Sequence, residues 1–298
     1  MGRNAIVGQS GGPTAVINSS LVGVFQAAKS RGAQHVYGMR YGVKGLLEEQ
    51  VVDLSDTLRD NLDIEILKRT PASYLGSCRY KLPVPAEDPA LYEKLFGILK
   101  KLDVGYFFYI GGNDSMDTIS KLSDYACMTG SDIKFMGVPK TIDNDLMNTD
   151  HTPGYGSAAK YIGAIMKEIT RDSLVYGTRN VTIVEVMGRN AGWLTGAAAL
   201  AKAEDCEGVD MICLPEVAFD IEHFIERLDV LQRAKAGVVI AVSEGVRVHD
   251  GRYVCELTEE LGPVDAFGHK TLTGAARFLA NKAVRELGCK ARAIELST

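Results

Sequence analysis

The sequence lacks the long apolar runs and the surplus of one charge that mark several classes of protein. No apolar run approaches the roughly 20 residues needed to cross a bilayer, so a membrane protein is not expected. Lys and Arg total 33 against 38 Asp and Glu, a formal net charge of -5, and no basic cluster stands out. Nucleic acid is therefore not an expected partner. The N-terminus leads straight into an apolar stretch, which leaves no room for a signal peptide.

Cysteine and histidine are scarce, and their spacing does not suggest a metal site. The six cysteines contain no C-x-x-C pair, and the five histidines show no zinc-binding spacing. Most of the cysteines lie in apolar stretches, so we expect reduced core thiols in a cytoplasmic protein. These cysteines are Cys78, Cys127, Cys206, Cys213, Cys255 and Cys289.

Short apolar runs alternate with stretches of helical periodicity along the 298 residues. This alternation predicts an α/β fold with parallel sheets and right-handed crossovers. The length suits about two domains. We place the boundary in a glycine-rich hinge, which gives domains 1–154 and 155–289, with 290–298 returning to the first. Expected strands are 5–7, 104–110, 135–138, 181–186, 211–214, 238–242 and one from 291, and expected helices include 90–102, 221–235 and 272–287.

The stretch with the clearest chemistry is Pro-Lys-Thr-Ile-Asp-Asn-Asp at 139–145, which follows a strand expected to be buried. Ligands bind at the carboxyl ends of strands in open α/β sheets. Asp143 and Asp145 are two residues apart, so in extended backbone their side chains would point the same way. With the cation of Lys140 and the hydroxyl of Thr141, they suit phosphoryl transfer. On these residues alone, a solvated acidic loop is the open alternative.

Other polar groups stand at further junctions between a strand and a helix. Glycine turns lie around Gly12 and, as Gly-Gly-Asn-Asp-Ser, at 111–115, where bare backbone N–H groups and a helix start favour phosphate. A tight connection explains the first turn equally well, and a helix cap explains either polar residue of the second. The later strand ends add Met187, Gly188, Arg189 and Glu244, and a polar loop adds Arg79.

Four segments, at 10–12, 111–115, 139–145 and 184–189, resemble the phosphofructokinase family in order and spacing, over nearly the whole chain. The resemblance implies two doubly wound, Rossmann-like parallel-sheet domains with the active site in the cleft between them. It assigns the phosphoryl donor and Mg²⁺ to the first domain and the sugar phosphate to the second. It also implies a homodimer or homotetramer. Because the family continues into an arginine-bearing segment, we expect the chain to be truncated at its C-terminus.

Two positions resemble the pyrophosphate-dependent branch of that family. ATP-dependent members carry glycine where this chain has Asp114 and Lys140. A carboxylate at 114 would repel the α-phosphate of ATP, and an ammonium at 140 would neutralise a small inorganic polyanion. The implied reaction moves a phosphoryl group from pyrophosphate to the 1-hydroxyl of fructose 6-phosphate. ATP as donor, and a catalytically weak or regulatory chain, are the alternatives.

The resemblance also implies roles for single residues. Asp143 is the expected general base, Asp145 and Thr141 orient its surroundings, and Lys140 and Asp114 select the donor. Asn113 is the expected Mg²⁺ contact, where its carbonyl replaces the aspartate of most members with one charge fewer. Expected substrate contacts are Gly12, Arg79, Thr141, Ile142, Asp143, Met187, Gly188, Arg189 and Glu244.

Overall fold

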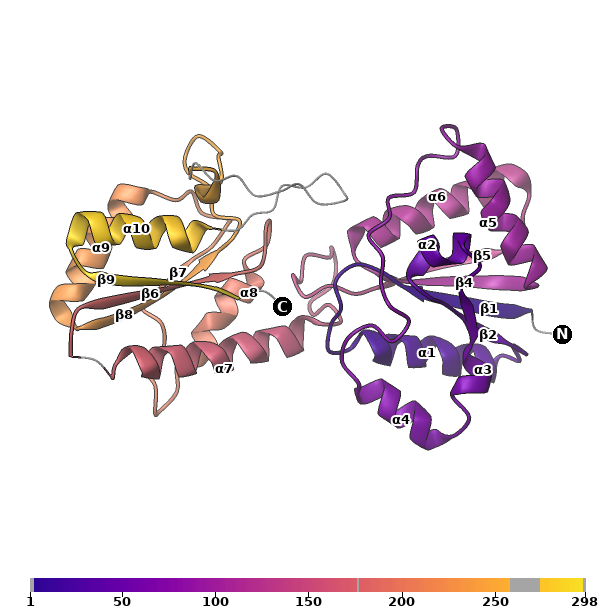
Figure 1. Cartoon of the computed structure of the whole chain (residues 1–298), viewed down its shortest axis with the longest axis horizontal. Helices are drawn as coiled ribbons and strands as arrows, with labels where there is room; N and C mark the ends of the chain where they lie inside the picture. Colours follow the sequence, from indigo (N-terminus) through magenta and orange to yellow (C-terminus); the bar gives the residue numbers. More distant parts are fainter. Residues whose placement is uncertain (1–2, 176, 258–273, 297–298) are drawn as a thin grey trace. The chain divides into compact units, whose positions relative to one another are not determined.

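The computed structural model describes residues 3–175, 177–257 and 274–296, and the chain divides into two compact units, Met1–Thr141 and Ile142–Thr298. We call them unit 1 and unit 2. Each unit is a sheet with helices on both faces, so the predicted α/β fold is confirmed (Figure 1).

Unit 1 holds a five-stranded sheet in the order β3-β2-β1-β4-β5. Its strands are β1 (Asn4–Gln9), β2 (Val36–Met39), β3 (Val51–Asp53), β4 (Val104–Gly111) and β5 (Lys134–Pro139). All neighbours pair in parallel except β2 and β3, which are antiparallel. The expectation of purely parallel sheets is therefore wrong at β3. The connection from β2 carries only the short helix α2 (Gly42–Leu47), which is too short for a parallel crossover.

Successive residues of β1 enter different cores because side chains alternate across a strand. Ala5 and Val7 pack with α1 (Ile17–Ser30), α3 (Leu54–Thr57) and α4 (Asn61–Arg69). Ile6 packs on the opposite face with α2, α5 (Pro89–Lys101) and α6 (Asn113–Thr129). Figure 1 shows these two helical layers on either side of the sheet. This alternation is why the short apolar run at the start of the sequence indicates a strand covered on both faces.

The strand before 139–145 was expected to be buried, and that expectation is wrong. β5 ends the sheet, with β4 as its neighbour in the described strand order. Met136 is 58% exposed, and Lys134 and Pro139 are also exposed. A strand at the edge of a sheet has a neighbouring strand on one side only, so its side chains are less buried than its apolar sequence predicts.

Unit 2 holds a four-stranded parallel sheet in the order β7-β8-β6-β9. Its strands are β6 (Asn180–Val186), β7 (Met211–Cys213), β8 (Gly237–Ser243) and β9 (Lys290–Leu296). One face is covered by α7 (Tyr155–Ser173), α8 (Trp193–Gly196) and η1 (Ala197–Ala201). The other is covered by α9 (Ile221–Ala234), α10 (Ala275–Leu287) and η2 (Val254–Leu257). The first two residues of the helix expected at 272–287 lie outside the described residues.

The structure corrects both predicted domain limits. The boundary lies between Thr141 and Ile142 rather than after residue 154. Ile142 packs on the core beneath α7, which ties the segment after it to unit 2. Residues 290–296 do not return to the first domain, because β9 pairs with β6 along its whole length, with Ala293 beside Ile183. Residues 297 and 298 lie outside the described part.

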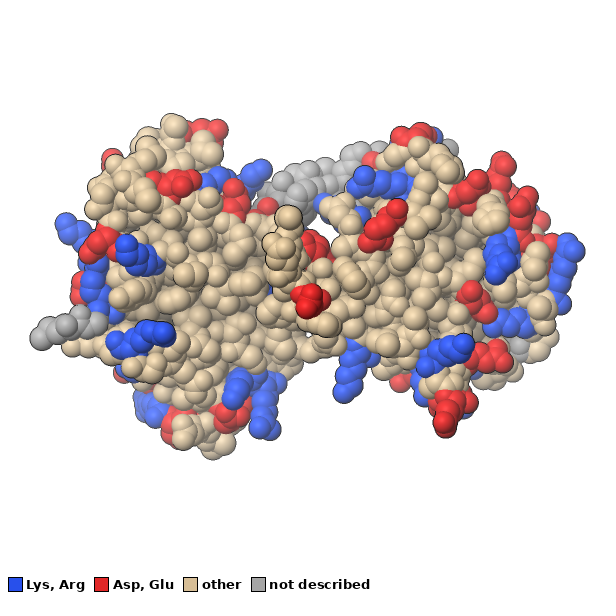
Figure 2. Space-filling model, turned by 180° about the vertical axis from the view of Figure 1, so that it is seen from behind, with Lys and Arg blue, Asp and Glu red and all other residues tan. Residues whose placement is uncertain are grey.

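The surface carries mixed charge. Lys and Arg alternate with Asp and Glu over the face drawn in Figure 2. Among the described residues, no helix combines the length and apolarity that a membrane span requires. Cys206, Cys255 and Cys289 are buried as expected, whereas Cys127, near the end of α6, is exposed and is not a core thiol.

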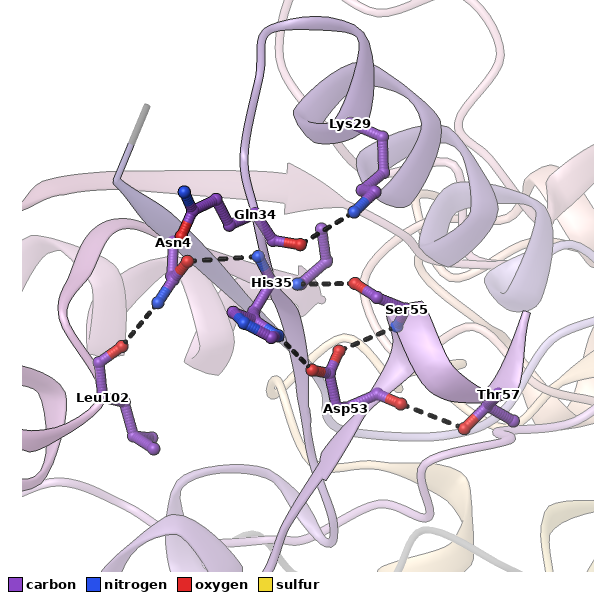
Figure 3. A network of polar contacts seen from close by, with 9 residues as sticks. Asn4, Lys29, Gln34, His35, Asp53, Ser55, Thr57 and Leu102 are labelled. Atoms are coloured by element: carbon purple, nitrogen blue, oxygen red, sulfur yellow. Dashed lines mark hydrogen bonds and ion pairs between the residues drawn. The ribbon is translucent and has the colours of Figure 1, made fainter. Parts of the chain in front are cut away.

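A polar network fastens the antiparallel strand β3 to its surroundings (Figure 3). His35 Nδ1 and Asp53 Oδ2 lie 2.5 Å apart, and Asp53 Oδ1 accepts from Ser55 N at 2.8 Å, which caps α3. Asn4 accepts from His35 N at 3.1 Å and donates to Leu102 O at 3.0 Å. Asp53 therefore takes part in a hydrogen bond with His35, caps a helix and ends a strand.

Replacing Asp53 with alanine is expected to destabilise the protein by about 1–2 kcal/mol, because a helix cap and a hydrogen bond to His35 are lost together. Urea unfolding of the two proteins would measure the difference. Asp56→Ala is the matched control, since Asp56 is exposed within the same helix. An equal loss in both variants would contradict the assigned role.

Candidate active site

The two glycine turns of unit 1 meet at one edge of its sheet, because β1 and β4 are parallel neighbours. Ser10 N donates to Ile110 O at 2.9 Å. The hydroxyl groups of Ser10 and Ser115, both buried, are hydrogen-bonded to each other. A Cβ atom at Gly111 would lie 1.9 Å from Ser115 Oγ, so this approach requires glycine. The turns are thus a single assembly.

Lys140 joins this assembly from the end of β5. Its side chain is almost fully buried at 4% exposure, and its Nζ donates to Gly12 O at 2.5 Å. Its backbone N–H donates to Gly111 O at 2.9 Å. The structure therefore brings Gly12 and Lys140, two of the predicted site residues, into direct contact. A buried ammonium beside bare backbone is suited to a compact anion.

Asn113 and Asp114 are the first two residues of α6, and both are exposed. The N-cap of this helix is Gly112, and no side chain caps it. A side-chain cap therefore does not account for these two residues, although a carboxylate in the first turn, as at Asp114, also complements the helix dipole. The positive end of the helix dipole, with backbone N–H groups facing outward, favours an anion here.

Arg79 belongs to a segment that lies along the first glycine turn. Gly11 N donates to Cys78 O at 3.3 Å, and Ser77 Oγ donates to Gly11 O at 2.5 Å. Arg79 follows directly and is exposed, as its polar surroundings in the sequence indicate. A second cation therefore stands near the turn that holds Gly12.

The side-chain oxygen atoms of unit 1 determine whether a divalent metal ion could bind there. The part of the chain that the structure describes has no group of three or more His, Cys, Asp or Glu side chains placed to hold a metal. Asn113 and Asp114 offer two oxygen donors at the start of α6. Mg²⁺ is usually bound through one or two carboxylates together with substrate phosphates and water. The residues present fit a metal that arrives with its phosphate ligand.

In unit 2, the loop after Ile142 is bent rather than extended. Asn144 is buried and adopts a positive φ of 57°. Its side chain donates to Asp150 O at 3.0 Å and accepts from Thr152 N at 2.8 Å. The expectation of extended backbone between Asp143 and Asp145 is therefore wrong. Asp143 is half-buried and Asp145 is exposed, so the two carboxylates have different surroundings.

The predicted sugar-phosphate residues directly follow the neighbouring strands β6 and β8, whose last residues, Val186 and Ser243, are in register. Glu244 N donates to Val186 O at 3.0 Å, and Gly188 N donates to Glu244 Oε1 at 3.3 Å. Met187 and Arg189, on either side of Gly188, are half-buried. The register of these two strands thus places the four residues together.

The carboxyl group of Glu244 is unusual for a glutamate. Its pKa is raised to about 7, mainly by burial and also by the negative charges of Asp143 and Glu185. The hydrogen bond that it accepts from Gly188 N–H acts in the opposite direction. The positive charge of Arg189 also lowers the pKa. Asp143 and Arg189 are therefore both close enough to Glu244 to influence its charge. The group therefore changes charge near neutral pH.

Glu244→Gln is expected to change how stability depends on pH. The folded pKa lies above the ordinary 4.5, so protonated Glu244 contributes stability in full below pH 4.5, and this is lost as pH rises through about 7. Because Glu244 is partly exposed to solvent, its pH-dependent contribution to the free energy of unfolding is expected to be only about 2 kcal/mol. Unfolding temperatures between pH 4.5 and 8 should fall more in the unmodified chain than in Glu244→Gln. Parallel curves would show that Glu244 is not perturbed.

Sequence reasoning missed three polar residues that support the site. Ser10 and Ser115 join the glycine turns, and Ser243 ends β8 with 0% exposure. It also missed Glu185, which is buried in β6, where it accepts from Ala276 N at 2.8 Å and where burial raises its pKa. The available signal was a glutamate between valines in an apolar strand. The serines carried no such signal, because small polar residues are common near turns.

The chain is similar to known proteins over nearly all of its length. A family model described as phosphofructokinase matches residues 4–295. A pyrophosphate–fructose 6-phosphate 1-phosphotransferase of Methylococcus capsulatus is 42% identical over 293 residues, which are 97% of this chain and 68% of that protein. The Xanthomonas campestris enzyme of the same name is 41% identical over 289 residues, covering 96% and 68%.

The fold is also similar to that of a solved structure. The crystal structure of a pyrophosphate-dependent phosphofructokinase from Nitrosospira multiformis superposes with a TM-score of 0.83 at 36% sequence identity. The match covers 99% of this chain and 69% of that one.

Proposed function

Since the chain belongs to the phosphofructokinase family, we infer that it transfers a phosphoryl group from pyrophosphate to the 1-hydroxyl of fructose 6-phosphate. The products are fructose 1,6-bisphosphate and inorganic phosphate, and the reaction is a reversible step of glycolysis. The observation that carries the choice of donor is Lys140, a buried ammonium bonded to the glycine turn at Gly12. Relatives named for the same activity support this inference.

Unit 1 binds the donor in this proposal. The Lys140 ammonium, the Arg79 guanidinium and the backbone near Gly12 neutralise and align pyrophosphate. Asp114 opposes a longer nucleotide, because its carboxylate would face the α-phosphate. Repulsion of one donor and attraction of the other together set the preference.

Unit 2 binds the sugar phosphate and supplies the base. Asp143 accepts the proton of the 1-hydroxyl as the new O–P bond forms and the bridging O–P bond of pyrophosphate breaks. Thr141, the last residue of unit 1, and Asp145 orient this region. Contacts to fructose 6-phosphate come from Ile142, Met187, Gly188, Arg189 and Glu244. Such a transfer depends mainly on alignment and charge neutralisation.

Mg²⁺ is the proposed cofactor, with Asn113 and Asp114 as its protein contacts. When bound, the ion neutralises negative charge on the phosphate oxygens. We also propose a cytoplasmic homodimer or homotetramer, which the family resemblance supports.

A coupled assay for fructose 1,6-bisphosphate, run with pyrophosphate or ATP in the presence of Mg²⁺, tests the proposal. We expect pyrophosphate to give a kcat/KM at least about a hundredfold higher than ATP, equivalent to roughly 2.7 kcal/mol of discrimination. Reversal of that order would overturn the donor assignment. Absence of turnover with either donor, in a chain that binds fructose 6-phosphate, would favour a regulatory role.

A further inference from the structure

Ser243 is the last residue of β8 and the residue before Glu244. It is fully buried at 0% exposure, in a strand whose other side chains, apart from Gly237, are apolar. Its hydroxyl donates to Gly188 O at 2.7 Å and accepts from Gly245 N at 3.0 Å. The hydroxyl therefore joins two loops, 186–190 and 243–247, that leave neighbouring strands.

These loops are in contact at several other points. Glu244 N donates to Val186 O, and Glu244 Oε1 accepts from Gly188 N. A Cβ atom at Gly245 would lie 2.0 Å from the backbone oxygen of Arg189, so only glycine allows this approach. Farther out, Arg247 Nη2 donates to Asn190 Oδ1 at 3.2 Å. Ser243 is the buried end of this series of contacts.

The contacts of Gly188 show why the hydroxyl matters. Its N–H faces the Glu244 carboxylate while its carbonyl faces Ser243. Both peptide groups of Gly188 are thereby oriented, and the position of Arg189 follows from them. An alanine at 243 would leave the Gly188 carbonyl and the Gly245 N–H without this partner inside the protein, where a polar group without a hydrogen bond is costly.

We propose that Ser243 is a positioning residue for sugar-phosphate binding, because it fixes the backbone that presents Arg189 and Glu244. This inference rests on the proposed function of unit 2. Ser243 does not itself contact the substrate in this proposal. Its contribution is to hold the loops in the binding geometry before the substrate arrives, which lowers the cost of ordering them on binding.

The test compares the full chain with Ser243→Ala and Ser243→Thr. Alanine should raise KM for fructose 6-phosphate about tenfold, as expected for one buried hydrogen bond, with kcat and KM for pyrophosphate within about twofold. Threonine retains the hydroxyl and should restore most of the affinity. Ser173→Ala is the matched control, because Ser173 is a buried serine bonded to Asn180 Oδ1 at 2.8 Å in the same unit. It should leave all three constants unchanged.

Hydrogen–deuterium exchange provides a readout that does not depend on turnover. The Gly245 amide should exchange about tenfold faster in Ser243→Ala, and fructose 6-phosphate should slow exchange of 186–190 and 243–247 in the unmodified chain. Unchanged Gly245 exchange, or an unchanged KM beside faster exchange, would overturn the positioning role. If Ser243→Ala does not fold, the unmodified chain still tests the proposal. The positioning role would be overturned if that chain is active but fructose 6-phosphate does not slow amide exchange of 186–190 and 243–247. Faster Gly245 exchange with no sugar-phosphate binding by the unmodified chain would instead refute the proposed function.

Discussion

Asp143→Asn is expected to lower kcat by about 10²- to 10⁴-fold, because the proposed general base is removed while the shape of the side chain is kept. Asp143 is half-buried, and its charge raises the pKa of Glu244, so part of its surroundings is protein rather than solvent. The affinity for fructose 6-phosphate should change by less than about tenfold. Steady-state kinetics and isothermal titration on the same preparations would measure the two effects.

Asp150→Asn is the matched control for this experiment. Asp150 lies in the same loop, it is exposed, and only its backbone oxygen takes part in the hydrogen bond from Asn144. Its kcat should stay within about twofold of the unmodified chain, since exposed polar changes rarely perturb a site. If Asp143→Asn retains a tenth or more of the activity, another group must serve as the base.

Lys140→Met is expected to lower kcat/KM for pyrophosphate by about 10²- to 10³-fold, the range for losing one preorganised electrostatic contact. Methionine preserves the length of the side chain but removes the charge that Lys140 places next to Gly12. Binding of fructose 6-phosphate should change by less than about twofold, because the proposed sugar-phosphate contacts belong mainly to unit 2. Kinetics with each substrate varied in turn would separate these effects.

A second lysine of unit 1 provides the comparison. Lys121 has a side chain that is 15% exposed, and its Nζ donates to Leu82 O at 2.9 Å, much as Lys140 donates to Gly12 O. Lys121→Met should therefore reproduce any general cost of removing a partly buried ammonium without affecting pyrophosphate. Equal kinetic losses in the two variants would show that Lys140 acts through stability alone.

The positions of the chemical groups followed from the sequence because strands and junctions are short-range features. An apolar run followed by glycine or polar residues predicts the end of a strand, and strands do end at or near Gly111, Lys140 and Gly188. A helix begins directly afterwards only at the first of these, where α6 starts at Asn113. In a parallel sheet, neighbouring strand ends share an edge, so the grouping within each unit followed as well.

What could not be predicted depended on long-range pairing or on single side chains. Nothing local distinguishes β5 as an edge strand, since its residues are as apolar as those of a central strand. The pairing of β9 with β6 joins segments far apart in the sequence. The bend at Asn144 depends on its two side-chain hydrogen bonds to Asp150 and Thr152, which only the folded loop provides.

The position of β9 in its sheet determines when that sheet can be completed during synthesis on the ribosome. Every strand of the first sheet lies before residue 141, so this half can fold before the other half has been synthesised. β6, in contrast, receives its neighbours β8 and β9 from later sequence. At about 5–20 residues per second, the roughly 100 residues between β6 and β9 take about 5–20 s to emerge. During that interval, the edge of β6 that will accept β9 is open to pairing with other nascent chains, which makes the second half the part most in need of chaperone protection.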